Sequence, residues 1–143
     1  MKGRLIVIDG LDGAGKQTQA ALLLDRFARA GVPARGISFP DYTHPSSALV
    51  KQYLAGEFGQ ADDVPAYAAS SFYAVDRFAS YVGYWKDDYL AGHTIIADRY
   101  ATSNLIHQMG KLPRGQWDAF IDWSADFEYE KLGLPKPDAV LFL

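Results

Sequence analysis

The chain contains no cysteine among its 143 residues. Disulfide bonds, thiolate metal sites and a cysteine nucleophile are therefore excluded. Long apolar runs are also missing, because no stretch approaches the roughly 20 apolar residues that a membrane-spanning helix needs. The run Leu5–Ile8, close to the N-terminus, is too short for a secretion signal. These absences favour a cytoplasmic protein that acts away from membranes.

A strong positive charge is absent as well. The formal net charge is −3, whereas proteins that bind duplex nucleic acid need a basic face to displace counterions from the phosphates. The histidines, His44, His93 and His107, are too scattered along the chain for a typical metal site. Nucleic acid is therefore not expected as a partner, and any positive charge that binds a ligand must be local.

The residues that are present suffice for one hydrophobic core. Hydrophobic residues make up 49% of the chain and aromatic residues 14%. A chain of this length usually forms a single core, and neither a repeat nor a Ser/Gly-rich linker marks a boundary. We therefore expect one domain over residues 1–143.

Strand and helix patterns alternate along the chain. Apolar runs bounded by turn residues predict strands over 4–8, 34–39, 93–97 and 139–143. Helical periodicity and end signals between them predict helices over 16–30, 45–54, 65–90, 101–110 and 114–131. Strands separated by helices imply right-handed crossovers. The predicted fold class is therefore α/β, with a parallel sheet covered by helices.

One apolar stripe at helical spacing runs along the helix predicted over 65–90, and we expect it to face the core. Its members are Tyr67, Ser71, Ala74, Phe78, Tyr81, Trp85 and Tyr89. Ligands of parallel sheets bind at the carboxyl ends of the strands. The residues that directly follow each predicted strand are therefore the informative ones.

A glycine-rich loop, Asp9–Thr18, directly follows the first predicted strand. Its Gly10, Gly13 and Gly15 let backbone N–H groups converge on one anion, and the helix that starts near Lys16 adds the positive end of its dipole. Lys16 supplies a point charge for the outer phosphates of a nucleotide. The G-x4-G-K pattern between an apolar strand and a helix therefore predicts a phosphate-binding loop.

Two positions in this loop leave questions open. A Ser or Thr that binds magnesium directly follows the lysine in such loops, but here Gln17 holds that position and Thr18 comes one residue later. Asp12 has two interpretations. Its carboxylate turns away from the phosphates towards a metal or a hydroxyl group, or it caps the start of the helix.

Two further pairs carry groups suited to a nucleotide. Asp98 and Arg99 end the third predicted strand, where Asp98 can orient magnesium or its waters and Arg99 can clamp a phosphate. The alternative is a salt-bridged strand end. Tyr73 and Arg77 lie four residues apart on the long helix, where a ring can stack on a planar base and a guanidinium can bond its edge. The alternative is a packed aromatic beside a solvated arginine.

Taken together, these residues resemble the thymidylate kinase family of nucleoside monophosphate kinases. The resemblance rests on ordered motifs: GLDGAGKQTQ (10–19), FP (39–40), YAVDR (73–77), DRYATSN (98–104) and GLPKPD (133–138). It implies a three-layer P-loop NTPase fold, with a parallel sheet flanked by helices. It also implies transfer of the γ-phosphoryl group of ATP to dTMP, giving ADP and dTDP, with Mg²⁺ as cofactor.

The resemblance assigns roles by position. The ATP-binding residues would be Gly10, Gly13, Ala14, Gly15, Lys16, Gln17 and Thr18. The acceptor site would contain Asp12, Phe39, Tyr73, Arg77, Arg99, Asn104 and His107. Arg99 would bridge the acceptor phosphate, while Asp12 would reach the acceptor's 3'-hydroxyl or, like Asp98, the metal and its waters. The expected catalytic residues are therefore Lys16, Arg99 and Asp12.

The chain also departs from the family pattern. The arginine that commonly follows Phe39-Pro40 is replaced by Asp41 and Tyr42, and His107 stands where many members have a tyrosine beside the sugar. Members with glycine at position 13 resemble the type whose catalytic arginines lie in a lid, and the chain ends before that lid, the last strand and the C-terminal helices. Loss of such an arginine costs on the order of 10³ to 10⁵ in rate. The 143 residues alone are therefore expected to be weakly active or inactive.

Other functions stay open at this point. One is a kinase for another deoxynucleoside or nucleoside monophosphate, and another is a nucleotide-binding module without catalysis. The family usually forms homodimers, and the sequence leaves a homodimer and a monomer open.

Overall fold

The structure is a computed structural model that describes residues 2–143. It consists of two compact units, each assembled from separate stretches of the chain. The sheet unit contains residues 2–39, 81–100 and 135–143, and the helical unit contains residues 40–80 and 101–134. The expectation of one domain stays a prediction. Within residues 2–143, none of the helices combines the length and the apolar character needed to cross a bilayer.

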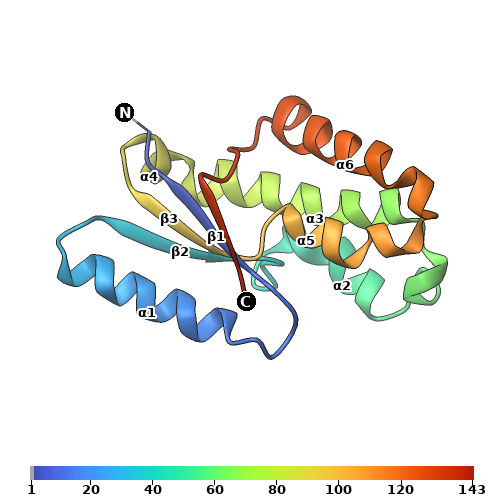
Figure 1. The fold of residues 1–143 in the computed structure, drawn as a ribbon, viewed down its shortest axis with the longest axis horizontal. Coiled ribbons are helices and arrows are strands. Elements are labelled where there is room, and N and C mark those ends of the chain that lie inside the picture. Colours follow the sequence, from blue (N-terminus) through green and yellow to red (C-terminus); the bar gives the residue numbers. More distant parts are fainter. Residues whose placement is uncertain (1) are drawn as a thin grey trace. The chain divides into compact units, whose positions relative to one another are not determined.

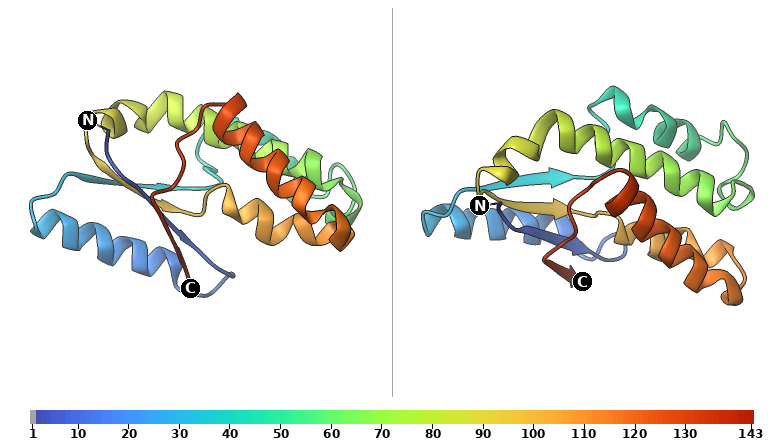
Figure 2. Two further views of the ribbon diagram at one scale, coloured as in Figure 1. Left: turned by 45° about the horizontal axis from the view of Figure 1, so that its top comes forward. Right: turned by 90° about the horizontal axis from the view of Figure 1, so that it is seen from above.

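A four-stranded sheet forms the centre of the sheet unit (Figure 1). Its strands are β1 (Leu5–Asp9), β2 (Ala34–Ser38), β3 (Thr94–Asp98) and β4 (Ala139–Phe142). They lie in the order β2-β3-β1-β4, and every pairing is parallel, with Val7 opposite Ala97 in β3 and Val140 in β4. All the strand arrows point the same way in Figure 2. The carboxyl ends of the strands therefore meet at one edge of the sheet.

Helices flank this sheet, and the strand sequences explain why. The interior strands β1 and β3 consist almost entirely of apolar residues, as expected of strands buried on both faces. Helix α1 (Lys16–Arg29) packs against the sheet, and Leu24 comes so close to β2 that a Cβ on Gly36 would lie 2.7 Å from it. A π-helical segment (Tyr81–Trp85) and α4 (Lys86–Leu90) also belong to this unit. The parallel α/β fold is therefore confirmed (Figures 1 and 2).

The helical unit is built from short helices around a small apolar core (Figure 1). Its α-helices are α2 (Ala48–Leu54), α3 (Ala66–Ser80), α5 (Thr102–His107) and α6 (Trp117–Ala125). A π-helical segment, Asp126–Lys131, continues α6. Short 3₁₀ turns cover Pro45–Ser47, Ala61–Asp63, Met109–Lys111 and Arg114–Gln116. Tyr53, Val64 and Ala69 form a buried cluster against which Phe72 and Tyr73 pack.

The predicted core stripe of the long helix is confirmed at Ala74, Tyr81, Trp85 and Tyr89, which are buried, but it is wrong at Tyr67 and Phe78. Residues 66–90 are helical, but Tyr67 is 37% exposed and Phe78 is 40% exposed. The buried face of α3 passes through Ala74, as predicted, and then through Arg77 in place of Phe78. Neighbouring residues differ by about 100° around a helix, so Phe78 lies on a different face from Arg77. A polar residue occupies the buried position that an apolar pattern would assign to Phe78.

Candidate functional site

The glycine-rich loop joins β1 to α1 at the carboxyl edge of the sheet. Two of its glycines adopt positive φ angles, 80° for Gly13 and 92° for Gly15, which residues with a Cβ rarely adopt. Gly15 directly precedes the first residue of α1. The loop therefore presents the N-terminus of a 14-residue helix beside backbone that only glycine follows without strain, as a phosphate-binding loop requires.

Lys16 is held by the loop itself. Its Nζ donates hydrogen bonds to the backbone oxygens of Gly10 (3.2 Å) and Leu11 (2.8 Å), and the residue is only 7% exposed. These neutral carbonyl groups are weaker partners for an ammonium group than a charged phosphate oxygen. The ammonium group of Lys16 therefore lies at the loop, where a phosphate oxygen can replace these backbone oxygens as its partner.

Arg99 has an unusual backbone conformation at the end of β3. Its φ is 68°, and it is the one residue other than glycine with a positive φ in the described part of the chain. Its backbone N–H donates to the Ile8 oxygen (2.9 Å), which fixes the turn to the neighbouring strand. Such a conformation costs on the order of 1–3 kcal/mol and is found most often at functional sites. The carboxyl edge of the sheet therefore holds an arginine in a strained turn.

The side chain of Arg99 pairs with Asp12 of the loop. Arg99 Nη2 donates to Asp12 Oδ1, so two of the predicted site residues meet within the sheet unit. No side chain caps α1, whose N-cap residue is Gly15. The capping interpretation of Asp12 is therefore wrong. The alternative that Arg99 forms a salt bridge at the end of the strand is confirmed, and its partner is Asp12.

Asp9 and Asp98 end the adjacent strands β1 and β3. Asp9 is fully buried, and its Oδ1 accepts the Gly10 N–H (2.9 Å). Burial raises the pKa of Asp98, the negative charge of Asp9 raises it further, and the cations Lys16 and Arg99 oppose this shift. The loss of water around the Asp98 carboxylate therefore destabilises its charged form by more than Lys16 and Arg99 stabilise it.

This shift predicts that Asp98→Asn stabilises the protein at neutral pH. Because the folded pKa lies above the unfolded one, the stabilisation that Asp98 contributes is complete below the unfolded pKa and is lost as the pH rises through the folded pKa. The increase in the free energy of unfolding caused by Asp98→Asn should therefore be largest at neutral pH and should become smaller in acid. Denaturant unfolding between pH 3 and 8 measures it, with the exposed Asp87→Asn as control. A gain that grows in acid would contradict the sign of this shift.

The residues beside the loop fit Mg²⁺. Gln17 and Asp98 both line a hollow of about 260 Å³ next to α1. In phosphoryl-transfer sites Mg²⁺ is held by one or two carboxylates together with substrate phosphates and water. Over residues 2–143, no three or more His, Cys, Asp or Glu side chains gather closely enough to hold a metal ion. Asp98 therefore offers one carboxylate to a metal that arrives with a nucleotide, whereas the rest of this hollow is mostly apolar.

In the helical unit, Arg77 is buried and paired. Its Nε lies 2.5 Å from Glu128 Oε1, and both side chains are 1% exposed. The alternative of a solvated arginine is therefore wrong. Sequence reasoning did not identify Glu128, which stands in a run of charged residues. Its spacing offered a signal, because Phe120, Ser124 and Glu128 recur every four residues and all three are buried.

The other predicted acceptor residues of this unit differ in their surroundings. Asn104 is buried, and its Nδ2 donates a hydrogen bond to the backbone oxygen of Ser70 at 3.3 Å. Tyr73 is partly buried, with its ring edge-on to Tyr53 at a centroid distance of 6.3 Å. His107 is exposed at the end of α5. Asn104 of α5 thus bonds to α3, the helix that carries Arg77, whereas His107 is exposed.

The segment after Phe39-Pro40 is anchored by a residue that sequence reasoning did not single out. Asp76 Oδ2 accepts the Asp41 N–H (2.9 Å), and Asp76 Oδ1 accepts the Ser46 hydroxyl (2.7 Å). Asp41 in turn lies 3.2 Å from His44 Nε2 and accepts the Thr43 hydroxyl. Asp41 therefore stabilises its own loop where the family commonly has an arginine. Phe39 itself lies in the sheet unit, with its ring 6.0 Å from that of Tyr100.

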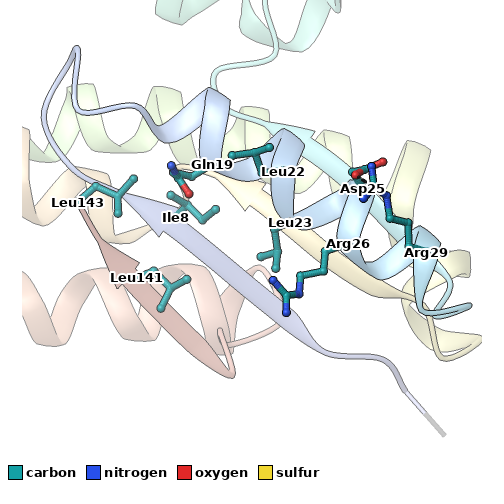
Figure 3. Close-up of a pocket in the computed structure, with 9 residues that line it drawn as sticks. All are labelled: Ile8, Gln19, Leu22, Leu23, Asp25, Arg26, Arg29, Leu141 and Leu143. Carbon is teal, nitrogen blue, oxygen red and sulfur yellow. Dashed lines mark ion pairs between the residues drawn. The ribbon is translucent and has the colours of Figure 1, made fainter.

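A second hollow of about 680 Å³ lies between α1 and β4 (Figure 3). Leu22 and Leu23 of α1 and Leu141 of β4 line it, and the ion pair between Asp25 and Arg29 lies at its rim. It contains none of the predicted catalytic residues. Its lining mixes apolar side chains with Gln19, Arg26 and the Asp25–Arg29 pair, and it lacks the glycine-rich backbone of the loop that follows β1.

Comparisons with known proteins agree with this geometry. The sequence profile of the family described as Thymidylate kinase matches residues 8–143. The thymidylate kinase of Mycobacterium tuberculosis (strain ATCC 25618 / H37Rv) is 33% identical over 135 residues, which is 94% of this chain and 62% of that protein. The thymidylate kinase of Homo sapiens is 32% identical over 142 residues, which is 99% of this chain and 61% of that protein.

A solved structure of thymidylate kinase from Candida albicans has the same fold, with a TM-score of 0.73 and 29% identity. The match covers 99% of this chain and 63% of that one. The chain thus spans less than two thirds of the length of these relatives. Because the family profile matches almost the whole chain, and the phosphate-binding loop and the strained Arg99 stand at the carboxyl edge of the sheet, the chain belongs to the thymidylate kinase family.

Proposed function

We propose that this protein transfers the γ-phosphoryl group of ATP to dTMP, giving ADP and dTDP. The observation that carries the proposal is Arg99, held in a left-handed conformation and paired with Asp12 of the phosphate-binding loop. Arg99 can bind one phosphate while the glycine-rich loop beside it binds another. This arrangement suits a reaction that brings two phosphates together. Phosphoryl transfer needs positioning and neutralisation of charge more than it needs a strong base.

The sheet unit supplies the groups for the phosphates. Gly10, Gly13, Ala14, Gly15, Lys16, Gln17 and Thr18 bind ATP in this proposal. Arg99 clamps the acceptor phosphate, and Asp12 leaves its pairing with Arg99 to reach the acceptor's sugar or the metal waters. Bound with ATP, Mg²⁺ would be oriented by Asp98 and Asp12, directly or through its waters, and would neutralise the phosphate charge.

The helical unit supplies the groups for the base. Tyr73 stacks on the base, and Arg77 and Asn104 donate hydrogen bonds to its edge. Two further acceptor residues are proposed, Phe39 of the sheet unit for the base and His107 for the sugar. The thymidylate kinase of Candida albicans is described as having a broad substrate specificity. The acceptor of this protein is accordingly proposed as a pyrimidine deoxynucleoside monophosphate, with dTMP preferred.

A coupled assay for ADP release tests this proposal. With ATP and Mg²⁺ present, we expect ADP to appear only after dTMP is added, and Arg99→Ala should lower the rate by roughly 10²-fold or more, as for other preorganised charge partners. The exposed Arg114→Ala is a matched control and should leave the rate unchanged. Equal ADP release with and without dTMP would contradict the proposal. Because these 143 residues are expected to be weakly active at most, ADP release is compared with the same reaction without dTMP, and binding of dTMP with no such excess would favour the non-catalytic module.

A further inference from the structure

The contact between Arg77 and Glu128 leaves polar atoms of both side chains unpaired. Arg–carboxylate pairs often form two parallel hydrogen bonds, but here one bond joins Nε and Oε1. Arg77 Nη2 and Glu128 Oε2 are both buried and have no hydrogen-bond partner. A guanidinium group carries five N–H donors and no acceptor. At least one donor group of Arg77 is therefore buried and unpaired, and a ligand that reached it could accept its hydrogen bond.

Folding alone does not explain such a pair. Removing two charges from water costs several kcal/mol per ion, and apolar residues of similar volume are often as stabilising or more so. Each buried polar atom left without a partner adds about 1–3 kcal/mol. A buried ion pair with an unpaired donor therefore lowers the stability of the fold. We infer that the pair serves a ligand.

The surroundings of Arg77 on α3 point the same way. Ser70 and Arg77 lie seven residues apart, on one face of α3, and Ser70 Oγ is also buried and unpaired. Asn104 of α5 approaches this face through its bond to the Ser70 oxygen. Glu128 approaches it from the π-helical segment Asp126–Lys131, and such segments are frequent at functional sites. Asn104 and Glu128 thus both approach α3, and Glu128, which was not predicted, contacts Arg77 itself.

We propose that Glu128 is a positioning residue that determines which base the acceptor site takes. By holding Nε of Arg77, Glu128 fixes the plane of the guanidinium group and leaves its other N–H groups to donate to the base edge. This inference rests on the proposed function. Because the guanidinium group only donates, it selects bases that offer a carbonyl oxygen at ring position 4, such as thymine and uracil. Cytosine carries an amino group there and would be rejected.

The test compares Glu128→Gln with the wild-type protein. Glutamine keeps the volume and one acceptor oxygen but removes the charge that orients Arg77. We expect the affinity for dTMP to fall about tenfold, as when a charge-assisted hydrogen bond becomes a neutral one. The affinity for dCMP should change little, so that the ratio of dTMP to dCMP affinity falls, and the affinity for ATP should stay within about twofold. Calorimetric titration measures all three, and Glu130→Gln, an exposed position of the same segment, is the matched control.

A second variant separates positioning from folding. Arg77→Met combined with Glu128→Leu removes both charges and fills the volume, so it should fold as stably as the wild type and still fail to prefer dTMP over dCMP. An unchanged dTMP/dCMP ratio in Glu128→Gln, or a retained preference in the double variant, would overturn the role of Glu128 while leaving the proposed function intact. A wild-type protein that binds ATP but no dTMP would overturn the proposed function and this inference together.

Discussion

Replacing Lys16 with methionine is expected to lower ATP-dependent turnover by roughly 10²–10³-fold, the usual effect of removing one preorganised charge partner of a transition state. Lys16 is the only cation in the loop 9–18. Its ammonium group is buried to 7% exposure and is held at the loop by two backbone oxygens. Methionine keeps the length of the side chain but cannot neutralise a phosphate. The loss should therefore be electrostatic and specific to the triphosphate.

Two measurements check the Lys16→Met result. Titration with ATP should show a large loss of affinity, while titration with dTMP should change by no more than about twofold. The control Lys51→Met changes an exposed lysine of α2 and should leave both titrations unaltered. If Lys16→Met binds ATP like the wild type, the loop does not bind the outer phosphates and the assignment fails.

The conformation of the glycine-rich loop 9–18 could be predicted from the sequence because its determinants are local. An apolar strand, glycines at fixed spacing and a lysine at the start of a helix all lie within residues 5–18, and the structure places them as the pattern requires. The order of strands and helices followed from the same kind of short-range signal. Parallel pairing was then the one arrangement that right-handed crossovers allow.

The surroundings of Arg77 could not be predicted in this way. Arg77 and Glu128 are 51 residues apart in the chain, and no local pattern pairs them. The apolar stripe of the long helix pointed to Phe78, whereas the buried side chain is Arg77 beside it. Arg99 was identified by its type and place, but its positive φ was not, because only tertiary contacts hold a residue with a Cβ in that conformation.

The buried pair also determines how the base site must be tested. Arg77→Ala would leave the Glu128 carboxylate buried without a partner, and breaking a buried pair in this way lowers stability by about 3–5 kcal/mol. That is a large part of the 5–15 kcal/mol that stabilises a typical domain. A loss of dTMP binding in Arg77→Ala would then report unfolding as much as a missing contact. The expected result is a marked fall in the midpoint of denaturant unfolding, whereas Arg114→Ala in the same unit should change it little.

The second half of this prediction is that a further substitution restores the stability. Adding Glu128→Leu to Arg77→Ala removes the unpaired carboxylate, so most of the 3–5 kcal/mol should return even though another native side chain is lost. Additive destabilisation by the two substitutions would show that the charges do not interact in solution. Recovery of stability without recovery of dTMP binding would instead show that Arg77→Ala loses dTMP because the guanidinium group is missing and not because the protein unfolds.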